Sequence, residues 1–178
     1  MKIIFLSKRS PQNKDLLKRP YGSFFHIPRL LAQRGHEIHI LLLSYFNQRE
    51  SDDRFSGIQW YSRDLWHRGP LSYWSTALTL VNNIKPDWIV GFSDTFFGIM
   101  AAHLGKKFGI KSAIDAYDNY ESYIPYLKPL HWLWQRALKS ATIVTAAGPQ
   151  LAELLQLYRQ GKSIHIVPMS ADPVFQPI

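Results

Sequence analysis

Short runs of apolar residues alternate along this chain with longer segments whose apolar positions repeat at helical spacing. Such alternation is typical of right-handed βαβ units, in which helices cover both faces of a parallel sheet. The pattern therefore predicts an α/β fold with a doubly wound sheet of about seven strands. The predicted strands cover residues 2–6, 37–43, 58–61, 88–91, 111–116, 142–147 and 164–167.

Two segments between these strands need a separate interpretation. Helical spacing from Gly22 to Gly35 predicts a helix with Ser23 as its N-cap and Leu30 on its buried side. Pro28 marks either the first turn of the regular helix or a kink within it. Residues 47–56 are polar, and we expect a mobile loop there.

The sequence SAIDAYDNYESY, Ser112–Tyr123, places three carboxylates where a predicted strand ends. Asp115, Asp118 and Glu121 are spaced three residues apart. Ligands of open α/β sheets bind beyond the carboxyl ends of the strands, so these acids are candidates for general acid–base chemistry. The alternative is that they only solvate a surface loop.

Composition limits the classes of protein that need to be considered. The 178 residues are 46% apolar and 19% charged, which suits one well-buried domain. A formal charge of +8 favours anionic partners of several kinds. The absence of cysteine excludes disulfides and thiolate chemistry, and no apolar stretch is long enough for a membrane span. We expect a soluble or peripherally bound protein.

A basic cluster follows the first predicted strand. Residues 7–22 contain five lysines and arginines, among them Lys8 and Arg9, in a segment predicted to be a loop with at most one helical turn. At the carboxyl end of a strand these side chains could hold a phosphate group. The alternative interpretation is an ordinary solvated surface.

The segment Tyr123–Lys139 is rich in aromatic and basic residues. Tryptophan and lysine anchor proteins at the headgroup depth of a membrane, so this segment could lie in a membrane interface. The alternative is a covering helix whose tryptophans pack on the sheet. The candidate membrane residues are Trp132, Trp134, Lys128 and Arg136.

Several catalytic and cofactor motifs are absent. No Gly-x-Gly-x-x-Gly follows the first strand, and no Gly-x-Ser-x-Gly occurs. Gly161–Ser163 reads Gly-Lys-Ser, but Gln156 stands where a phosphate-binding loop needs glycine. His36 and His39 are expected on opposite faces of a strand. The sequence thus predicts neither a metal site nor a cofactor.

Five segments occur in an order and spacing that resemble the N-terminal half of group 1 glycosyltransferases of the GT-B fold. These enzymes have two Rossmann-like domains, of which the first mainly binds acceptor and the second binds nucleotide-sugar. The five segments read RLLAQRGHEIHIL (29–41), IKPDWIVGF (84–92), KKFGIKSA (106–113), ALKSATIVTAAGPQLAELL (137–155) and IHIVPMSADPVFQP (164–177).

The resemblance implies a domain organisation and partners. Residues 1–167 would form the acceptor-side domain and 168–178 the start of an interdomain linker, with the donor-binding domain absent from this chain. The partners would be a nucleotide-sugar as co-substrate and a saccharide or lipid-linked acceptor. The setting would be cell-envelope or exopolysaccharide synthesis in the cytoplasm, with an anionic inner membrane face as a further partner.

The resemblance also implies roles for individual residues. Asp118 would hold the acceptor hydroxyl, with Asp115 second and Glu121 third. The sequence departs from the family pattern where Tyr117 replaces a histidine and where Gly22 is the only glycine of a usual pair. The other acceptor-side candidates are Ser93, Asp94, Tyr117 and Tyr120, and those for the donor phosphates are Gly22, Ser23, Lys8 and Arg9.

Two functions without catalysis remain as alternatives at this point. A basic nucleic-acid-binding module would bind duplexes with strong salt dependence, but no reading helix or stacking motif is recognisable, which disfavours nucleic acid. A membrane-surface adaptor would bind anionic vesicles and need no second domain.

Overall fold

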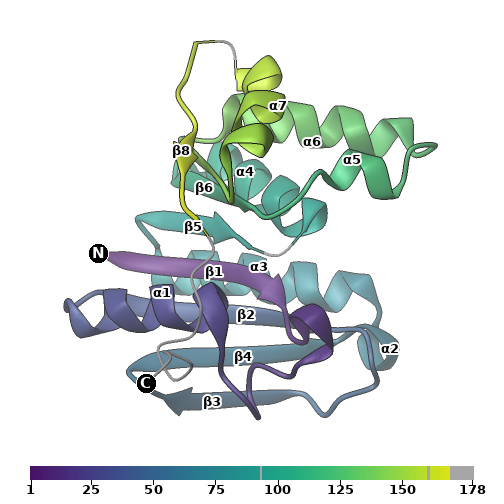
Figure 1. Ribbon diagram of the computed structural model, residues 1–178. Coiled ribbons are helices and arrows are strands. Elements are labelled where there is room, and N and C mark those ends of the chain that lie inside the picture. The colour runs from purple at the N-terminus through teal and green to yellow at the C-terminus, as the bar shows by residue number, and fades with distance from the viewer. Residues whose placement is uncertain (93, 160, 169–178) are drawn as a thin grey trace, which may run out of the picture. The chain divides into compact units, whose positions relative to one another are not determined.

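The computed structural model describes residues 1–92, 94–159 and 161–168. The chain divides into two compact units, Met1–Asp87 and Trp88–Pro168. The described residues contain eight strands, which are mostly parallel and alternate with helices (Figure 1). The predicted α/β class is therefore confirmed, with one strand more than the seven expected.

The first unit contains a four-stranded sheet in the order β3-β4-β2-β1. β1 and β4 lie on either side of β2 and pair parallel to it, and β3 runs antiparallel to β4. The strands are β1 (Lys2–Lys8), β2 (Glu37–Ser44), β3 (Ser51–Phe55) and β4 (Ile58–Asp64). The helices are η1 (Pro11–Asn13), α1 (Gly22–Gln33), α2 (Leu65–Arg68) and α3 (Pro70–Ile84).

Helices α1 and α3 cover opposite faces of this sheet. Trp60 of β4 stacks on Phe25 of α1, with ring centroids 6.4 Å apart. Arg63 lies three residues further along β4, so its side chain leaves the other face, where it donates a 3.2 Å hydrogen bond to Thr76 of α3. Coverage of both faces explains why β2 is buried at every position after its first residue.

Helix α1 differs from its prediction in two respects. Its N-cap is Tyr21, which makes no side-chain capping bond, so Ser23 lies inside the first turn. The helix continues through Pro28, which is buried together with Phe25. Leu30 follows Pro28 by two residues, about 200° around the helix axis. Its side chain therefore points to solvent and is 54% exposed, where a buried position was expected.

The polar segment expected to be mobile contains β3 instead. Ser56 and Gly57 both have positive φ, +54° and +76°, and they connect β3 to β4. Positive φ at both central residues matches the twist of two antiparallel strands, which makes a two-residue hairpin turn. Gly57 adopts this conformation without a steric penalty, and the hairpin adds the eighth strand.

The second unit contains four parallel strands in chain order, with helices between them (Figure 1). The strands are β5 (Trp88–Gly91), β6 (Lys111–Ala116), β7 (Ile143–Ala146) and β8 (His165–Ile166). The helices are α4 (Thr95–Phe108), α5 (Tyr120–Tyr123), α6 (Lys128–Ser140) and α7 (Pro149–Arg159). None of the helices in the described ranges has the length and apolarity needed to cross a membrane.

The core of the second unit depends on a close approach between α4 and α6. The ring of Trp134, 1% exposed, packs against Gly98 of α4. A Cβ atom at Gly98 would lie 2.6 Å from this ring and 3.2 Å from Ile114. Glycine is therefore required here for close packing, and α6 is held tightly over α4.

Candidate functional site

The carboxyl ends of β6 and β7 form one edge of the second unit, because these strands are parallel neighbours. The acidic segment leaves β6 at this edge and leads into α5. The chain leaves β7 at the same edge and enters α7 at Pro149. Residues 30 positions apart in the sequence are thus brought together by strand pairing alone.

Asp115 is still part of β6 and is mostly buried. Its strand partner in β7 is Thr145, whose hydroxyl donates a hydrogen bond to the Asp115 carboxylate. Burial raises the pKa of Asp115, and the hydrogen bond from Thr145 partly opposes that shift. The environment of Asp115 therefore favours a structural or proton-holding role more than a freely solvated one.

Asp118 lies on the loop between β6 and α5. One carboxylate oxygen accepts a 2.8 Å bond from the Asn119 amide, and the other accepts a hydrogen bond from the Tyr123 hydroxyl. That hydrogen bond is the main reason why the pKa of Tyr123 is raised. Both oxygens of Asp118 are therefore oriented, although the side chain remains near solvent.

A groove of about 580 Å³ lies between the loop that carries Asp118 and the start of α7. This volume falls in the range of small-molecule sites, about 300–1,000 Å³. Asp118 is the only acidic residue among the described residues that line it. The lining residues are Tyr117, Asp118, Asn119, Ala147, Gly148, Pro149, Gln150, Leu151 and Leu154.

Glu121 does not line this groove. Its two carboxylate oxygens accept hydrogen bonds from Gln135 of α6, at 2.8 Å, and from the Tyr158 hydroxyl of α7, at 3.2 Å. Glu121 thus connects α5 to two longer helices. The three carboxylates predicted as one group occupy three different environments, and only Asp118 faces the groove.

The other acceptor-side candidates also separate. Tyr117 lines the groove, whereas the ring of Tyr120 packs edge-on against Trp134 with centroids 5.5 Å apart. Burial raises the pKa of Tyr120, and the charges of Asp94 and Asp115 raise it further. Asp94 caps α4 by accepting a 3.0 Å bond from the Phe96 amide. Ser93 lies outside the described residues.

The donor-phosphate candidates lie in the first unit. Arg9 is buried and makes a two-point contact with Asp15, with nitrogen–oxygen distances of 3.0 and 3.1 Å. A third guanidinium nitrogen of Arg9 donates to the Arg49 carbonyl at 2.7 Å and to the Ser62 hydroxyl at 3.1 Å. The structure thus places Arg9 in a buried structural network.

The remaining donor-side candidates are closer to the surface. The Lys8 amino group lies 5.4 Å from the centroid of the Tyr45 ring. Gly22 opens α1 with φ of +61°, and no heavy atom lies within 4 Å of the position its Cβ would take. Ser23 follows it in the first turn, where backbone N–H groups are suited to an anion.

The two candidate membrane tryptophans have different positions. Trp132 is 54% exposed, and the Arg136 guanidinium lies 4.4 Å from the centroid of its ring. Lys128 is exposed at the start of α6. Trp134 belongs to the core, so its ring cannot anchor at a membrane surface; this corrects its inclusion among the candidates. The covering-helix interpretation holds for Trp134 and not for Trp132.

Sequence reasoning missed four residues that hold the acidic segment: Thr145, Tyr123, Gln135 and Tyr158. Only Thr145 left a usable signal, because it stands at the position of β7 that in-register pairing places opposite Asp115. The other three depend on how α5, α6 and α7 pack against one another. Among the described residues, no group of three histidine, aspartate or glutamate side chains is placed to hold a metal ion.

Comparison with known proteins supports the resemblance to glycosyltransferases. A family model described as "Glycosyl transferase 4-like domain" matches residues 25–170. No curated protein matches the chain.

Solved structures with the same fold include HepE of Anabaena in complex with UDP, at TM-score 0.57 and 14% identity over 94% of this chain. The UDP-GlcNAc 2-epimerase of Methanocaldococcus jannaschii has the same three values. An E. coli trehalose-6-phosphate protein bound with UDP-2-fluoro glucose has TM-score 0.51 and 13% identity over 95%. The chain spans 44%, 45% and 49% of these three chains, which is less than half of each.

Proposed function

Because the chain belongs to the glycosyl transferase 4-like domain family, we propose that it forms the acceptor-side domain of an enzyme that transfers a sugar from a nucleotide-sugar to a hydroxyl group. The observation that carries this proposal is the position of Asp118 as the single carboxylate of the 580 Å³ groove. The acceptor would lie in this groove, with its hydroxyl next to Asp118.

Asp118 has the chemistry that this step requires. A hydroxyl is a weak nucleophile at neutral pH, and a carboxylate within hydrogen-bonding distance can polarise or remove its proton, which typically contributes roughly 100- to 10,000-fold. If the reaction inverts the anomeric carbon, Asp118 acts as the base. If the reaction retains it, the donor phosphate takes the proton and Asp118 orients the acceptor.

The donor would be held mainly by a second domain. Two of the structurally similar proteins were solved with UDP or a UDP-sugar analogue, and this chain spans less than half of each. We therefore propose a nucleotide-sugar as donor, with Gly22, Ser23 and Lys8 as the contacts from this domain. Arg9, next to Lys8 in the sequence, would stabilise the loop after β1 through its contact with Asp15.

The cellular setting is part of the same proposal. The exposed aromatic and basic residues of α6 support peripheral binding to an anionic membrane, where a lipid-linked acceptor would be found. We therefore propose that the enzyme acts in cell-envelope or exopolysaccharide synthesis on the cytoplasmic face.

The test is a transfer assay with a protein in which this chain is continued by its downstream coding sequence. Labelled UDP-sugars are supplied with membrane-extracted acceptors, and labelled product and released nucleotide are both measured. We expect transfer by the extended protein and none by the 178-residue chain, since preorganised groups for the departing diphosphate would lie on the second domain. Turnover by the shorter chain within tenfold of the extended protein would contradict the proposal.

A further inference from the structure

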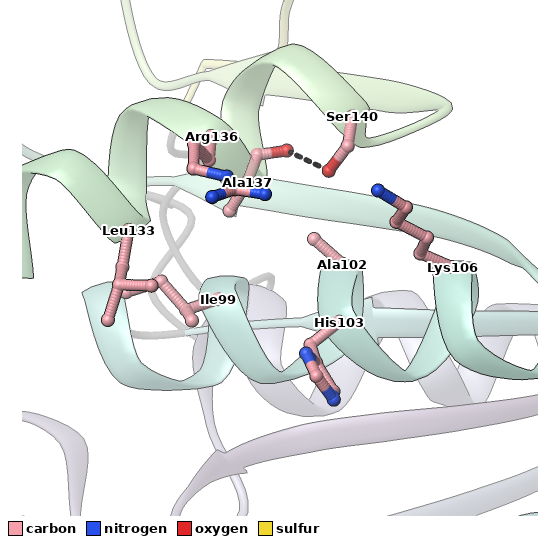
Figure 2. A pocket seen from close by; sticks show the side chains of 8 residues that line it. All are labelled: Ile99, Ala102, His103, Lys106, Leu133, Arg136, Ala137 and Ser140. Atoms are coloured by element: carbon pink, nitrogen blue, oxygen red, sulfur yellow. Dashed lines mark hydrogen bonds between the residues drawn. The ribbon is translucent and has the colours of Figure 1, made fainter.

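A second groove lies between α4 and α6, away from the carboxyl edge of the sheet. It encloses about 300 Å³. Figure 2 shows Lys106 rising from α4 towards α6, with its amino group on the side of Ser140. The lining residues are Ile99, Ala102, His103, Lys106, Leu133, Arg136, Ala137 and Ser140.

The charged side chains that line this groove, among the residues that the structure describes, are positive. Lys106 and Arg136 come from different helices, and none of the described lining residues is a carboxylate. Arg136 is held by Trp132, whose ring faces the guanidinium at 4.4 Å. Stacking uses the flat face of a guanidinium and leaves its N–H groups at the edge, where they can donate to a phosphate.

The surroundings of the groove are apolar. Ile99, Ala102 and Ala137 contribute its inner wall, and Leu133 at its mouth is 42% exposed. Trp132 of α6 and Leu127, the N-cap residue of the same helix, are also exposed. Two cations beside exposed tryptophan and leucine side chains are what a protein presents to the headgroup region of an anionic bilayer.

We propose that this groove binds the phosphate of an anionic phospholipid headgroup, with Lys106 and Arg136 as its two cationic ligands and with Trp132 and Leu133 entering the interface. The inference rests on the proposed function in one respect, the location of the enzyme at a membrane. The groove is at the small end of ligand sites, so a phosphate group fits it better than a nucleotide. A free phosphate would also leave the neighbouring apolar side chains in water.

The test is flotation of the full-length protein with vesicles of phosphatidylcholine alone or with phosphatidylglycerol added. The variant Lys106→Ala/Arg136→Ala removes both ligands. The matched control Lys107→Ala/Lys139→Ala removes the same charge from the same two helices outside the groove lining. Measurements at about 0.3 M salt reduce diffuse attraction, because the screening length is then only several ångström.

We expect the groove variant to lose at least tenfold more binding to anionic vesicles than the control pair, with circular dichroism unchanged for both. Equal losses in the two variants would indicate diffuse electrostatic attraction and would overturn the proposal. So would equal binding to neutral and anionic vesicles, or full displacement by millimolar glycerol phosphate, which would identify a site for free phosphate. No sugar donor is present, so the result does not depend on transferase activity.

Discussion

The hydroxyl of Thr145 donates a hydrogen bond to the carboxylate of Asp115 across the register that pairs these residues in β7 and β6. A buried carboxylate is stabilised in its ionised form by such a donor, and the structure offers this one from a neighbouring strand. The relationship ties the ionisation of Asp115 to the stability of the second unit.

Replacing Thr145 with valine should therefore weaken the protein in a pH-dependent way. The pKa of Asp115 is already raised by burial, and loss of the donor should raise it further. A carboxyl whose pKa is higher in the folded than in the unfolded state, where it is about 3.9, binds its proton more tightly when folded. Its contribution to stability is therefore complete at a pH below the unfolded pKa and is lost as the pH rises through the folded pKa. We expect Thr145→Val to lower the free energy of unfolding by roughly 1.5–3 kcal/mol at pH 7 and by less at pH 4.

Urea unfolding at the two pH values measures this difference. Thr79→Val is a suitable control, because the Thr79 hydroxyl donates only to the Ser75 carbonyl on an exposed face of α3. A loss in Thr145→Val of the same size at both pH values would show that the ionisation of Asp115 is not involved.

Asp118→Asn tests the acceptor-side carboxylate. Asparagine keeps the size of the side chain and can still accept one of the two hydrogen bonds from Asn119 and Tyr123, so the fold should be little affected. We expect the transfer rate of the full-length protein to fall by the equivalent of about 2 kcal/mol or more. The thermal midpoint should change little. Asp53→Asn, an exposed residue of β3, is the control. Near-normal turnover of Asp118→Asn would exclude the catalytic role.

Glu121 offers a different outcome because its oxygens accept bonds from Gln135 and Tyr158. Glu121→Gln keeps an acceptor and should retain most activity, whereas Glu121→Ala leaves both donors without their partner. We expect the alanine variant to lose about 1–2 kcal/mol of stability and a matching share of activity. If Glu121 were itself the base, glutamine and alanine would reduce turnover equally without a parallel loss of stability.

Arg9 provides a test of the buried network in the first unit. Removal of one partner from a buried ion pair leaves the other charge uncompensated and typically costs about 3–5 kcal/mol. Arg9→Ala should approach this loss in urea unfolding, because Asp15 would keep its buried position. Arg9→Lys should recover only part of it, since lysine cannot make the two-point contact. Lys18→Ala, at an exposed position, should be nearly neutral, and an equally small effect of Arg9→Ala would contradict the structural role.

The elements with strong periodicity were predictable from the sequence. β5 and β6 have the predicted bounds, and α4 ends at Phe108, followed by Gly109, which adopts φ of +67° as the C-cap. Hydrophobic period is a local signal, so a single chain is enough to identify such strands, and a glycine in the left-handed region is an equally local stop for a helix.

The errors occurred where distant residues decide the outcome. β3 lies at the end of the sheet, where its side chains are largely exposed. Its sequence is therefore polar and lacks the alternation of apolar and polar residues that marks a strand. Trp134 is buried because Gly98 leaves space for its ring. Arg9 is held in the interior by Asp15 and Ser62. For the candidate site, the location at the strand ends was predictable, but the separate environments of Asp115, Asp118 and Glu121 follow from partners on other elements.

The charged strand β3 also bears on how molecules of this protein coexist. A strand at the end of a sheet offers unpaired backbone groups to any neighbouring chain, and flat apolar edges promote aggregation. In β3, Asp52, Asp53 and Arg54 are all exposed, and the strand is only five residues long. A second molecule that added a strand there would have to bring its own backbone against two carboxylates and a guanidinium. The polar residues of β3 make the strand hard to recognise from hydrophobicity. They also oppose the addition of a strand from a second molecule.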